Sequence, residues 1–219
     1  PDFHIDWEEV RKMITSKTRM IIINSPNNPT GAVLTDSDLV QLQHLIQGTN
    51  IVVLSDEVFE SIVFDNNTHQ SVSRYEKLAS RSFVVSSFGP VFNINGWGLA
   101  YILAPEKLMN EFRRIQQFQI FNVNTPLQYA LSEYLQTEDS KKDISEMYQG
   151  KRNYFNRLLN DSLFKIVPSQ GSYFEILDYS NISDESDADF TFRLASEYGV
   201  CVIPVSAFLH EKNKLKMIR

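Results

Sequence analysis

Polar residues gather at points where apolar runs of the sequence end. Residues 20–23 form one such run, and the turn-rich stretch Asn-Ser-Pro-Asn-Asn-Pro-Thr-Gly follows at 24–31. The run 51–54 leads directly to Asp56, and a third run leads into Ser-Ser-Phe-Gly at 86–89. Because the carboxyl ends of parallel strands meet at one edge of a sheet, we expect these polar side chains to surround one ligand.

The residue types fit the recognition of a small polar ligand. Asparagine amides donate and accept hydrogen bonds, a carboxylate can hold a protonated nitrogen, and an arginine binds a carboxylate through two parallel N–H groups. The candidates are Asn24, Asn28, Asp56, Ser87 and Arg219. Each also has a plain structural reading: the asparagines as part of a common turn, the aspartate as a loop acid, the serine as a loop serine, and the arginine as a surface residue at the end of the chain.

The elements that must position these residues alternate between strands and helices. Apolar runs without alternation are typical of strands covered on both faces, and we predict such strands at 20–23, 51–54, 83–86 and 99–103. Thr35 and Asp38 have the spacing of a capping box, which predicts a helix from there to about residue 46. The alternation indicates an α/β fold with a parallel or mixed sheet.

The second half of the chain has a different texture. Besides a helix at 7–14 near the start of the chain, we predict helices at 105–117, 126–135 and 141–159. After them we predict one helix at 188–198 among short strands at 165–167, 172–176, 200–203 and 216–218. This change predicts two domains. Residues 1–150 would be the later part of a large domain, and residues 151–219 a small α+β domain that is truncated.

The composition bounds the partners of the protein. A formal net charge of −6 without any cluster of lysine or arginine argues against nucleic acid and against an anionic membrane. No apolar segment approaches the roughly 20 residues that span a bilayer. Nothing at the start resembles a signal peptide, so we expect a cytoplasmic location. Cys201, the single cysteine, lies between valines and is expected to be a buried core residue. We also expect a fragment of a longer protein, because the chain begins at Pro1 and stops within an apolar run.

Taken together, the motifs resemble the class I aminotransferases, which are pyridoxal-phosphate enzymes of fold type I. The nearest likeness is to the kynurenine and methionine aminotransferase branch. The likeness rests on residues 24–31, 55–60, 86–89, 96–97, 170–174, 203–208 and 217–219, in this order. It implies a three-layer large domain, incomplete at its N-terminus here, with a small α+β domain. It also implies pyridoxal 5'-phosphate as cofactor, amino acid and 2-oxo acid substrates, and a homodimer.

The resemblance gives each candidate residue an expected role. Asn28 matches the asparagine that donates to the phenolic oxygen of the cofactor, and Asn24 would orient cofactor or substrate. Asp56 matches the carboxylate that keeps the pyridine nitrogen protonated, which lets the ring withdraw electrons. Ser87 would bind the cofactor phosphate with the help of turn amides. Arg219 matches the arginine that holds the substrate carboxylate. The resemblance implies no metal.

Three positions depart from the family pattern. Pro90 stands where the family has the lysine that holds the cofactor as an imine, and proline has no amine with which to do so. Phe59 replaces a tyrosine whose hydroxyl contacts the cofactor. Gly98 replaces a basic phosphate partner, a loss of roughly 1.5–3 kcal/mol of charge-assisted contact. We therefore predict that this chain has no catalytic residue at position 90, does not transaminate, and binds the cofactor weakly or not at all.

Two other readings stay open. The chain could be a non-catalytic relative that keeps the fold for interaction, dimerisation or the binding of a small molecule. A dinucleotide-binding oxidoreductase is disfavoured because no Gly-x-Gly-x-x-Gly motif follows any predicted strand. If the upstream part of the family fold is missing, the sheet should show an uncovered edge and uncovered apolar faces.

Overall fold

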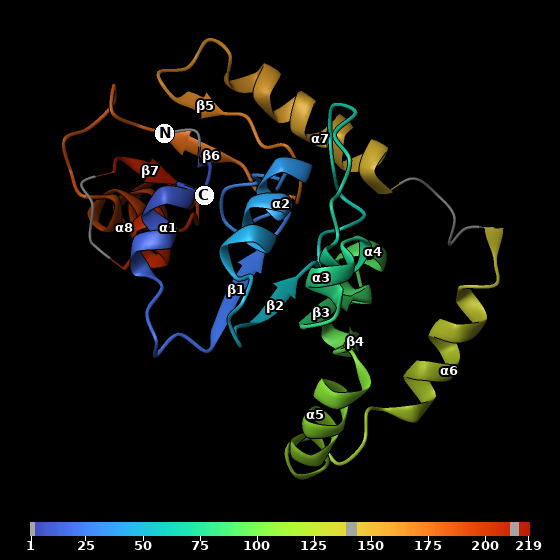
Figure 1. The fold of residues 1–219 in the computed structure, drawn as a ribbon. Helices are drawn as coiled ribbons and strands as arrows, with labels where there is room; N and C mark the ends of the chain where they lie inside the picture. Colours follow the sequence, from blue (N-terminus) through green and yellow to red (C-terminus); the bar gives the residue numbers. More distant parts are fainter. Residues whose placement is uncertain (1–2, 139–143, 211–214) are drawn as a thin grey trace.

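The computed structural model describes residues 3–138, 144–210 and 215–219, and it has a mixed α/β fold with two sheets (Figure 1). In the first sheet the strand order is β1-β2-β3-β4, with the first three strands parallel and β4 antiparallel. The second sheet is antiparallel, with the order β5-β6-β7. The strands are β1 (Met20–Asn24), β2 (Val52–Asp56), β3 (Ser82–Ser87), β4 (Ala100–Leu103), β5 (Lys165–Val167), β6 (Ile176–Asp178) and β7 (Met217–Ile218). The predicted α/β class with a mixed sheet is confirmed.

Helices connect the strands at nearly the predicted places. They are α1 (Trp7–Met13), α2 (Asp36–Leu45), α3 (Glu76–Ala79), α4 (Phe88–Phe92), α5 (Glu106–Gln119), α6 (Thr125–Tyr134), α7 (Ile144–Leu159) and α8 (Asp187–Tyr198). The capping box at the start of α2 is confirmed, because the Asp38 amide donates to the Thr35 hydroxyl and the Thr35 amide donates to the Asp38 carboxylate. The predicted start at 141–143 lies outside the described residues.

The core of the first sheet lies on the side where α2 packs. Leu39 and Leu42 of α2 are fully buried against Ile23 of β1 and Val53 of β2. The other face of β1 is open, since Ile22 is 68% exposed. The prediction that both faces of this strand are covered is therefore wrong within the described residues, whereas the predicted uncovered apolar face is present.

The segment after β2 makes close backbone contacts with the segment between β5 and β6. Val63 forms an antiparallel bridge with Gly171, and the Phe64 amide donates to the Gln170 carbonyl at 2.8 Å. A Cβ on Gly171 would meet the Ile62 carbonyl oxygen at 2.6 Å, so this approach requires glycine. The first sheet lies within residues 20–103 and the second within 165–218, while the division into domains at residue 150 stays a prediction.

Two details of the second sheet differ from the sequence prediction. The strand expected at 172–176 occurs at Ile176–Asp178, and Ser172 has a left-handed backbone with φ of 65°. Residues 200–203 form no strand, and Cys201 is exposed rather than buried in a core. The apolar residues on either side of Cys201 could not reveal its exposure. The exposure arises because the backbone next to it, at residue 203, pairs with Arg219 on one side only.

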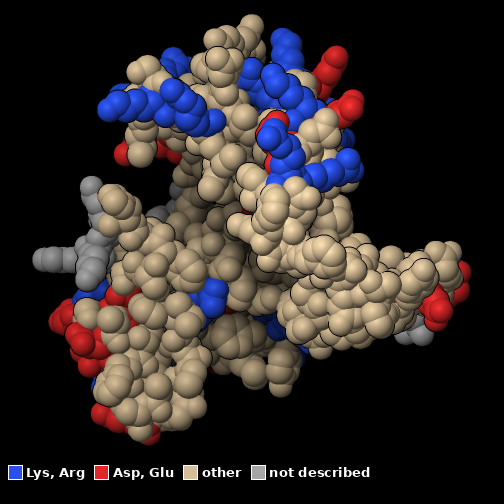
Figure 2. Space-filling view, turned by 90° about the horizontal axis from the view of Figure 1, so that it is seen from below, with Lys and Arg blue, Asp and Glu red and all other residues tan. Residues whose placement is uncertain are grey.

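None of the helices in the described part of the chain has both the length and the apolar character needed to cross a bilayer. The long helices α5 and α6 extend away from both sheets, toward the bottom and right of Figure 1. Residues 115–132, which run from α5 into α6, contain no charged side chain. Phe118 is 84% and Phe121 is 95% exposed, so this arm presents apolar surface to solvent. Figure 2 shows the corresponding uncharged surface on the right of its view.

Candidate functional site

The ends of β1 and β2 lie side by side and are cross-linked by Asn24. The register pairs Asn24 with Asp56, and the Asn24 side-chain amide donates to the Asp56 carbonyl at 3.1 Å. The side-chain oxygen of Asn24 accepts from the Asn28 backbone amide at 2.7 Å. Asn24 therefore fixes the turn that carries Asn28 relative to the strand that carries Asp56.

Arg219 reaches this turn from the other end of the sequence. Its guanidinium donates to the side-chain oxygen of Asn28 at 2.7 Å. The same group lies over the ring of Phe174, 4.1 Å from its centroid, and 5.3 Å from that of Phe208. Burial lowers the pKa of the Arg219 guanidinium, but an arginine stays protonated at neutral pH. The structure thus places a cation beside the Asn28 amide, in a position held by aromatic rings.

Asp56 is half-buried at the end of β2 and has one local hydrogen bond. Its carboxylate accepts from the Val58 amide at 3.2 Å. Burial raises the pKa of this carboxyl group above its usual value, and the neighbouring charge of Glu57 raises it further. A carboxylate in this state gains from a cationic partner, because such a partner would offset the desolvation of the charged form.

A buried network beside Asp56 was missed by the sequence analysis. The carboxylate of Glu57, only 1% exposed, accepts from the Ser55 hydroxyl, from the Val72 amide and from Nε2 of His69 at 2.9 Å. Burial alone would raise the pKa of Glu57, but the hydrogen bonds from His69 and Ser55 outweigh it and lower this pKa. The network ties the loop after β2 to residues 69–72 and supports the position of Asp56.

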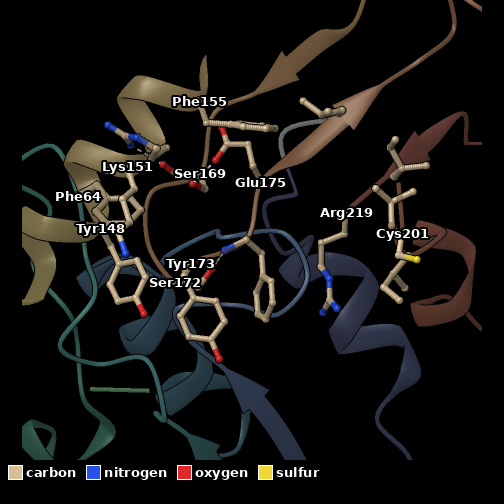
Figure 3. Close-up of a pocket in the computed structure, with 16 residues that line it drawn as sticks. Phe64, Tyr148, Lys151, Phe155, Ser169, Ser172, Tyr173, Glu175, Cys201 and Arg219 are labelled. Atoms are coloured by element: carbon tan, nitrogen blue, oxygen red, sulfur yellow. Dashed lines mark hydrogen bonds between the residues drawn. The ribbon is translucent and has the colours of Figure 1, made fainter. Parts of the chain in front are cut away.

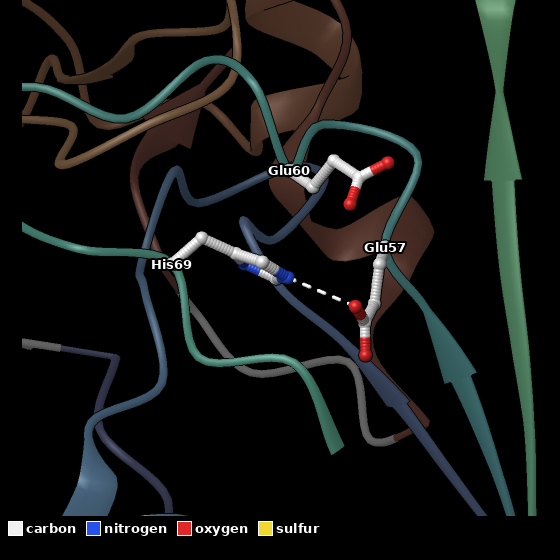
Figure 4. A group of neighbouring side chains, drawn as sticks. All are labelled: Glu57, Glu60 and His69. Carbon is white, nitrogen blue, oxygen red and sulfur yellow. Dashed lines mark hydrogen bonds and ion pairs between the residues drawn. The ribbon is translucent and has the colours of Figure 1, made fainter. Parts of the chain in front are cut away.

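Glu60 lies near this pair, and one ligand atom from each of Glu57, Glu60 and His69 falls within 4.8 Å of the others (Figure 4). These residue types can bind a metal ion. However, the Glu60 carboxylate already accepts from the hydroxyls of Ser86 and Tyr101, each at 2.7 Å. Both Glu57 oxygens and the Oε1 oxygen of Glu60 thus accept from protein donors, and we assign the cluster a structural role.

The turn after β3 contains two of the three positions that depart from the expected pattern, Pro90 and Gly98. Ser87 caps α4: its hydroxyl accepts from the Gly89 amide and donates to the Leu99 carbonyl, both at 3.1 Å. Pro90 is buried in the first turn of α4. Gly98 has a left-handed backbone with φ of 63°, and its surroundings are open.

Phe59 is 5% exposed, and its ring packs edge-on against Tyr173 at a centroid distance of 5.0 Å. It contributes packing but no hydroxyl. Position 90 offers no amine, position 98 offers no side chain, and the Ser87 hydroxyl is engaged locally. These residues do not fit a pyridoxal-phosphate group that is held through a lysine and a charged phosphate partner.

The sequence-predicted residues therefore fall into two groups. The structure brings Asn24, Asn28, Asp56 and Arg219 together through hydrogen bonds and strand register. Ser87 lies at the end of β3, whose residue Val85 pairs with Asp56. The lysines nearest in sequence to Pro90 are Lys77 on α3 and Lys107 on α5. Both are exposed, and neither is joined to this group by a contact among the described residues.

A cavity of about 470 Å³ lies next to Arg219 (Figure 3). The helix α7 contributes Tyr148, Lys151 and Phe155 to one wall, and Cys201 lies on the opposite side. The aromatic rings of Tyr148 and Tyr173 lie 5.5 Å apart along its lower edge. Helical spacing at 148, 151 and 155 could have suggested one shared face, but not the wall opposite to it.

The arrangement can bind an anion and a protonated nitrogen. Arg219 can hold a carboxylate, with the Asn28 amide beside it. The half-buried Asp56 can accept from a protonated nitrogen. No amine stands between these groups in the turn that contains Pro90.

Comparison with known proteins supplies the family context. Residues 1–217 match the family model for aminotransferase class I and II. The chain is 37% identical to the methionine aminotransferase of Escherichia coli, over 100% of this chain and 57% of that protein. It is 30% identical to a human kynurenine–oxoglutarate transaminase, over 97% of this chain and 51% of that protein.

Solved structures agree with the sequence comparison. The crystal structure of the Escherichia coli methionine aminotransferase matches with a TM-score of 0.95, covering 100% of this chain and 58% of that one. The N-succinyldiaminopimelate aminotransferase of Mycobacterium tuberculosis, at 30% identity, matches with a TM-score of 0.92 over 98% of this chain and 56% of that one. The chain thus spans a little over half the length of these relatives.

Proposed function

Because the chain belongs to the class I and II aminotransferase family, we propose that it keeps the ligand-facing residues of that family but does not itself transfer amino groups. Membership implies pyridoxal phosphate as the family's cofactor, and amino acids and 2-oxo acids as its substrates. Asn24, Asn28, Asp56 and Arg219 are the proposed contacts to such ligands, with Ser87 as a weak phosphate contact.

The observation that carries this proposal is the environment of Pro90. The residue is buried in the first turn of α4 and offers no amine at the end of β3. An imine between protein and cofactor requires a primary amine at that place. Phe59 and Gly98 add the loss of a hydroxyl and of a cation. We therefore expect binding of the cofactor to be weak and non-covalent.

Chemical trapping tests the proposal. The chain is incubated with pyridoxal phosphate, reduced with borohydride and digested, and its peptides are examined by mass spectrometry alongside an assay with amino acid and 2-oxo acid pairs. The Escherichia coli methionine aminotransferase is the positive control. We expect no turnover with this chain. A pyridoxyl-lysine accompanied by measurable turnover would refute the proposal.

A second function is favoured by the exposed apolar arm of α5 and α6. Phe118 and Phe121 are almost fully exposed, and such a surface is typical of an interface. This reading is a non-catalytic protein that uses the family fold for self-association, including a homodimer. Light scattering combined with a cofactor titration distinguishes the two, because stable self-association without cofactor binding would favour it. A cytoplasmic location stays a prediction of the sequence.

A further inference from the structure

A wedge of three residues, 169–171 between β5 and β6, lies between the turn after β1 and the loop after β2. The Gln170 amide donates to the Gly31 carbonyl at 3.0 Å, and the Phe64 amide donates to the Gln170 carbonyl at 2.8 Å. A Cβ on Gly31 would lie only 2.4 Å from the Cβ of Ser169, so the approach leaves no room for a side chain at position 31. The wedge is therefore fixed against both segments.

The side chain of Gln170 adds a second contact to the turn after β1. Its Oε1 oxygen accepts from the Val33 backbone amide at 3.1 Å, across 137 residues of sequence. Val33 is 7% exposed, so its amide needs an acceptor inside the protein. The turn is itself closed by a hydrogen bond from the Asn27 amide to the Ala32 carbonyl at 2.8 Å. A shift at Val33 would thus carry Asn28 with it.

The wedge leads directly into the segment that holds Arg219. Phe174 lies four residues after Gln170, and its ring centroid is 4.1 Å from the Arg219 guanidinium carbon. The Ser172 amide donates to the Ile62 carbonyl at 2.9 Å, which ties this segment to the loop after β2 as well. Residues 170–174 therefore contact both partners of the 2.7 Å hydrogen bond between Arg219 and the Asn28 side chain.

Asn24 and Gln170 hold the same turn in different directions. Asn24 joins the turn to β2, which is a strand of the same sheet as β1. Arg219, however, directly follows β7 in the second sheet. The distance between the Asn28 amide and the guanidinium thus depends on how the turn is held against the second sheet, and the Gln170 side chain provides such a contact.

We propose that Gln170 is a positioning residue for the Asn28–Arg219 pair: its side chain holds the turn at Val33, so that the Asn28 amide stays within hydrogen-bond reach of the guanidinium. The inference rests on the proposed function, in which this pair contacts a ligand carboxylate. Gln170 touches no ligand and acts through the turn. Loss of its Oε1 oxygen leaves the backbone hydrogen bonds of the wedge in place, so the fold persists while the turn gains freedom.

Two substitutions at position 170 separate the acceptor from the bulk of the side chain. Gln170→Met keeps an unbranched side chain of similar length but removes the acceptor, whereas Gln170→Glu keeps an acceptor oxygen at the same place. Gln117→Met is the matched control, because the exposed Gln117 side chain donates to the Arg114 carbonyl within α5. Far-ultraviolet circular dichroism verifies that each variant of the full 219-residue chain is folded.

NMR spectroscopy without any ligand gives the first readout. In Gln170→Met the Val33 amide should exchange with solvent about tenfold faster, the factor expected when one hydrogen bond is lost. The nuclear Overhauser effects between the Arg219 guanidinium protons and the Asn28 side chain should weaken in the same variant. Gln170→Glu should keep both signatures, and Gln117→Met should match the wild type.

A titration with L-methionine, followed through the Arg219 guanidinium signals, gives the second readout. Gln170→Met should bind this probe about tenfold more weakly than the wild type and Gln117→Met do. If the Arg219 signals of the wild type do not respond to L-methionine while the ligand-free signatures change as expected, the positioning by Gln170 is supported and the proposed ligand contacts are refuted.

Three results would overturn the inference. The first is a Gln170→Met variant whose Val33 exchange and Arg219–Asn28 signals equal those of the wild type. The second is a Gln170→Glu variant that loses these signals as completely as Gln170→Met, because the acceptor oxygen would then not be what holds the turn. The third is binding of L-methionine to Gln170→Met as tight as to the wild type.

Discussion

The ends of β1 and β2 differ from the turn after β3 in how they are held. The first region, which comprises Asn24, Asn28 and Asp56, is cross-linked by side chains that join distant segments, and Arg219 closes it across 191 residues. In the second region, residues 87–98, the capping serine bonds to the Gly89 amide and the Leu99 carbonyl nearby. A region held by its own backbone can change its chemistry without losing its fold.

Pro90 illustrates this difference. The amides in the first turn of a helix have no intrahelical partner, so a proline there removes no helical hydrogen bond. A lysine position can thus become proline with little effect on α4. At Asn24, by contrast, the side chain that would serve a ligand also supports the structure. The predictions below test this contrast.

The largest effect is expected in the core under the first region. Leu42→Ala should lower the free energy of unfolding by about 2–5 kcal/mol, because the side chain is fully buried between α2 and the sheet. Urea denaturation measures the change. The control Leu163→Ala alters a side chain that is 64% exposed and should change the free energy of unfolding by less than about 0.5 kcal/mol. Equal effects of the two changes would contradict the assigned core.

Asn24→Ala tests the cross-link itself. The change removes the acceptor for the Asn28 amide and the donor to the Asp56 carbonyl, so it should lower the free energy of unfolding by about 1–3 kcal/mol. Asn160→Ala is the matched control, because its side chain makes only a 3.4 Å contact with Asp161. If both variants unfold at the same urea concentration, Asn24 does not hold the region together.

Pro90→Ala should have a smaller effect on stability. Replacing proline increases the conformational freedom of the unfolded chain and costs about 0.4–1 kcal/mol, with no native hydrogen bond lost. Thermal unfolding followed by circular dichroism measures it. A loss above about 2 kcal/mol would show that Pro90 supports the turn, and it would remove the contrast between the two regions.

The smallest effects concern pH, and two adjacent carboxylates should respond in opposite ways. Burial raises the pKa of Asp56 above 3.8, so its favourable contribution is present below that pH and is lost as pH rises through the folded-state pKa. Burial by itself would raise the pKa of Glu57. The hydrogen bonds from His69 and Ser55 lower this pKa by more than burial raises it, so the net pKa lies below 4.5. Glu57 therefore stabilises the fold above pH 4.5, and this is lost as pH falls through the lower value.

Asp56→Asn should accordingly gain stability relative to the wild type as pH rises from 3.8 toward neutral, whereas Glu57→Gln should lose it as pH rises through the same acidic range. Urea midpoints measured across this range test the pair. Parallel trends for the two variants would mean that the His69 contact does not set the charge state of Glu57.

Elements of local origin could be predicted from the order of the amino acids. Continuous apolar runs located β1, β2 and β3, and the Thr35 and Asp38 spacing located the start of α2, because backbone preference and capping act within a few residues. The ordered motifs also identified the family. The same local signals placed the polar residues at the ends of strands, which is where the structure has them.

Which of these residues meet depends on how the whole chain folds. The contact of Arg219 with Asn28 and the burial of Glu57 against His69 depend on packing between segments that are far apart in sequence. The exposure of Cys201 depends on which strand edge is left unpaired. Local sequence does not encode these outcomes, because each depends on neighbours that only the folded chain supplies. The sequence alone therefore indicated a site that lacks its amine, and the fold revealed the cross-link that keeps the rest of that site in place.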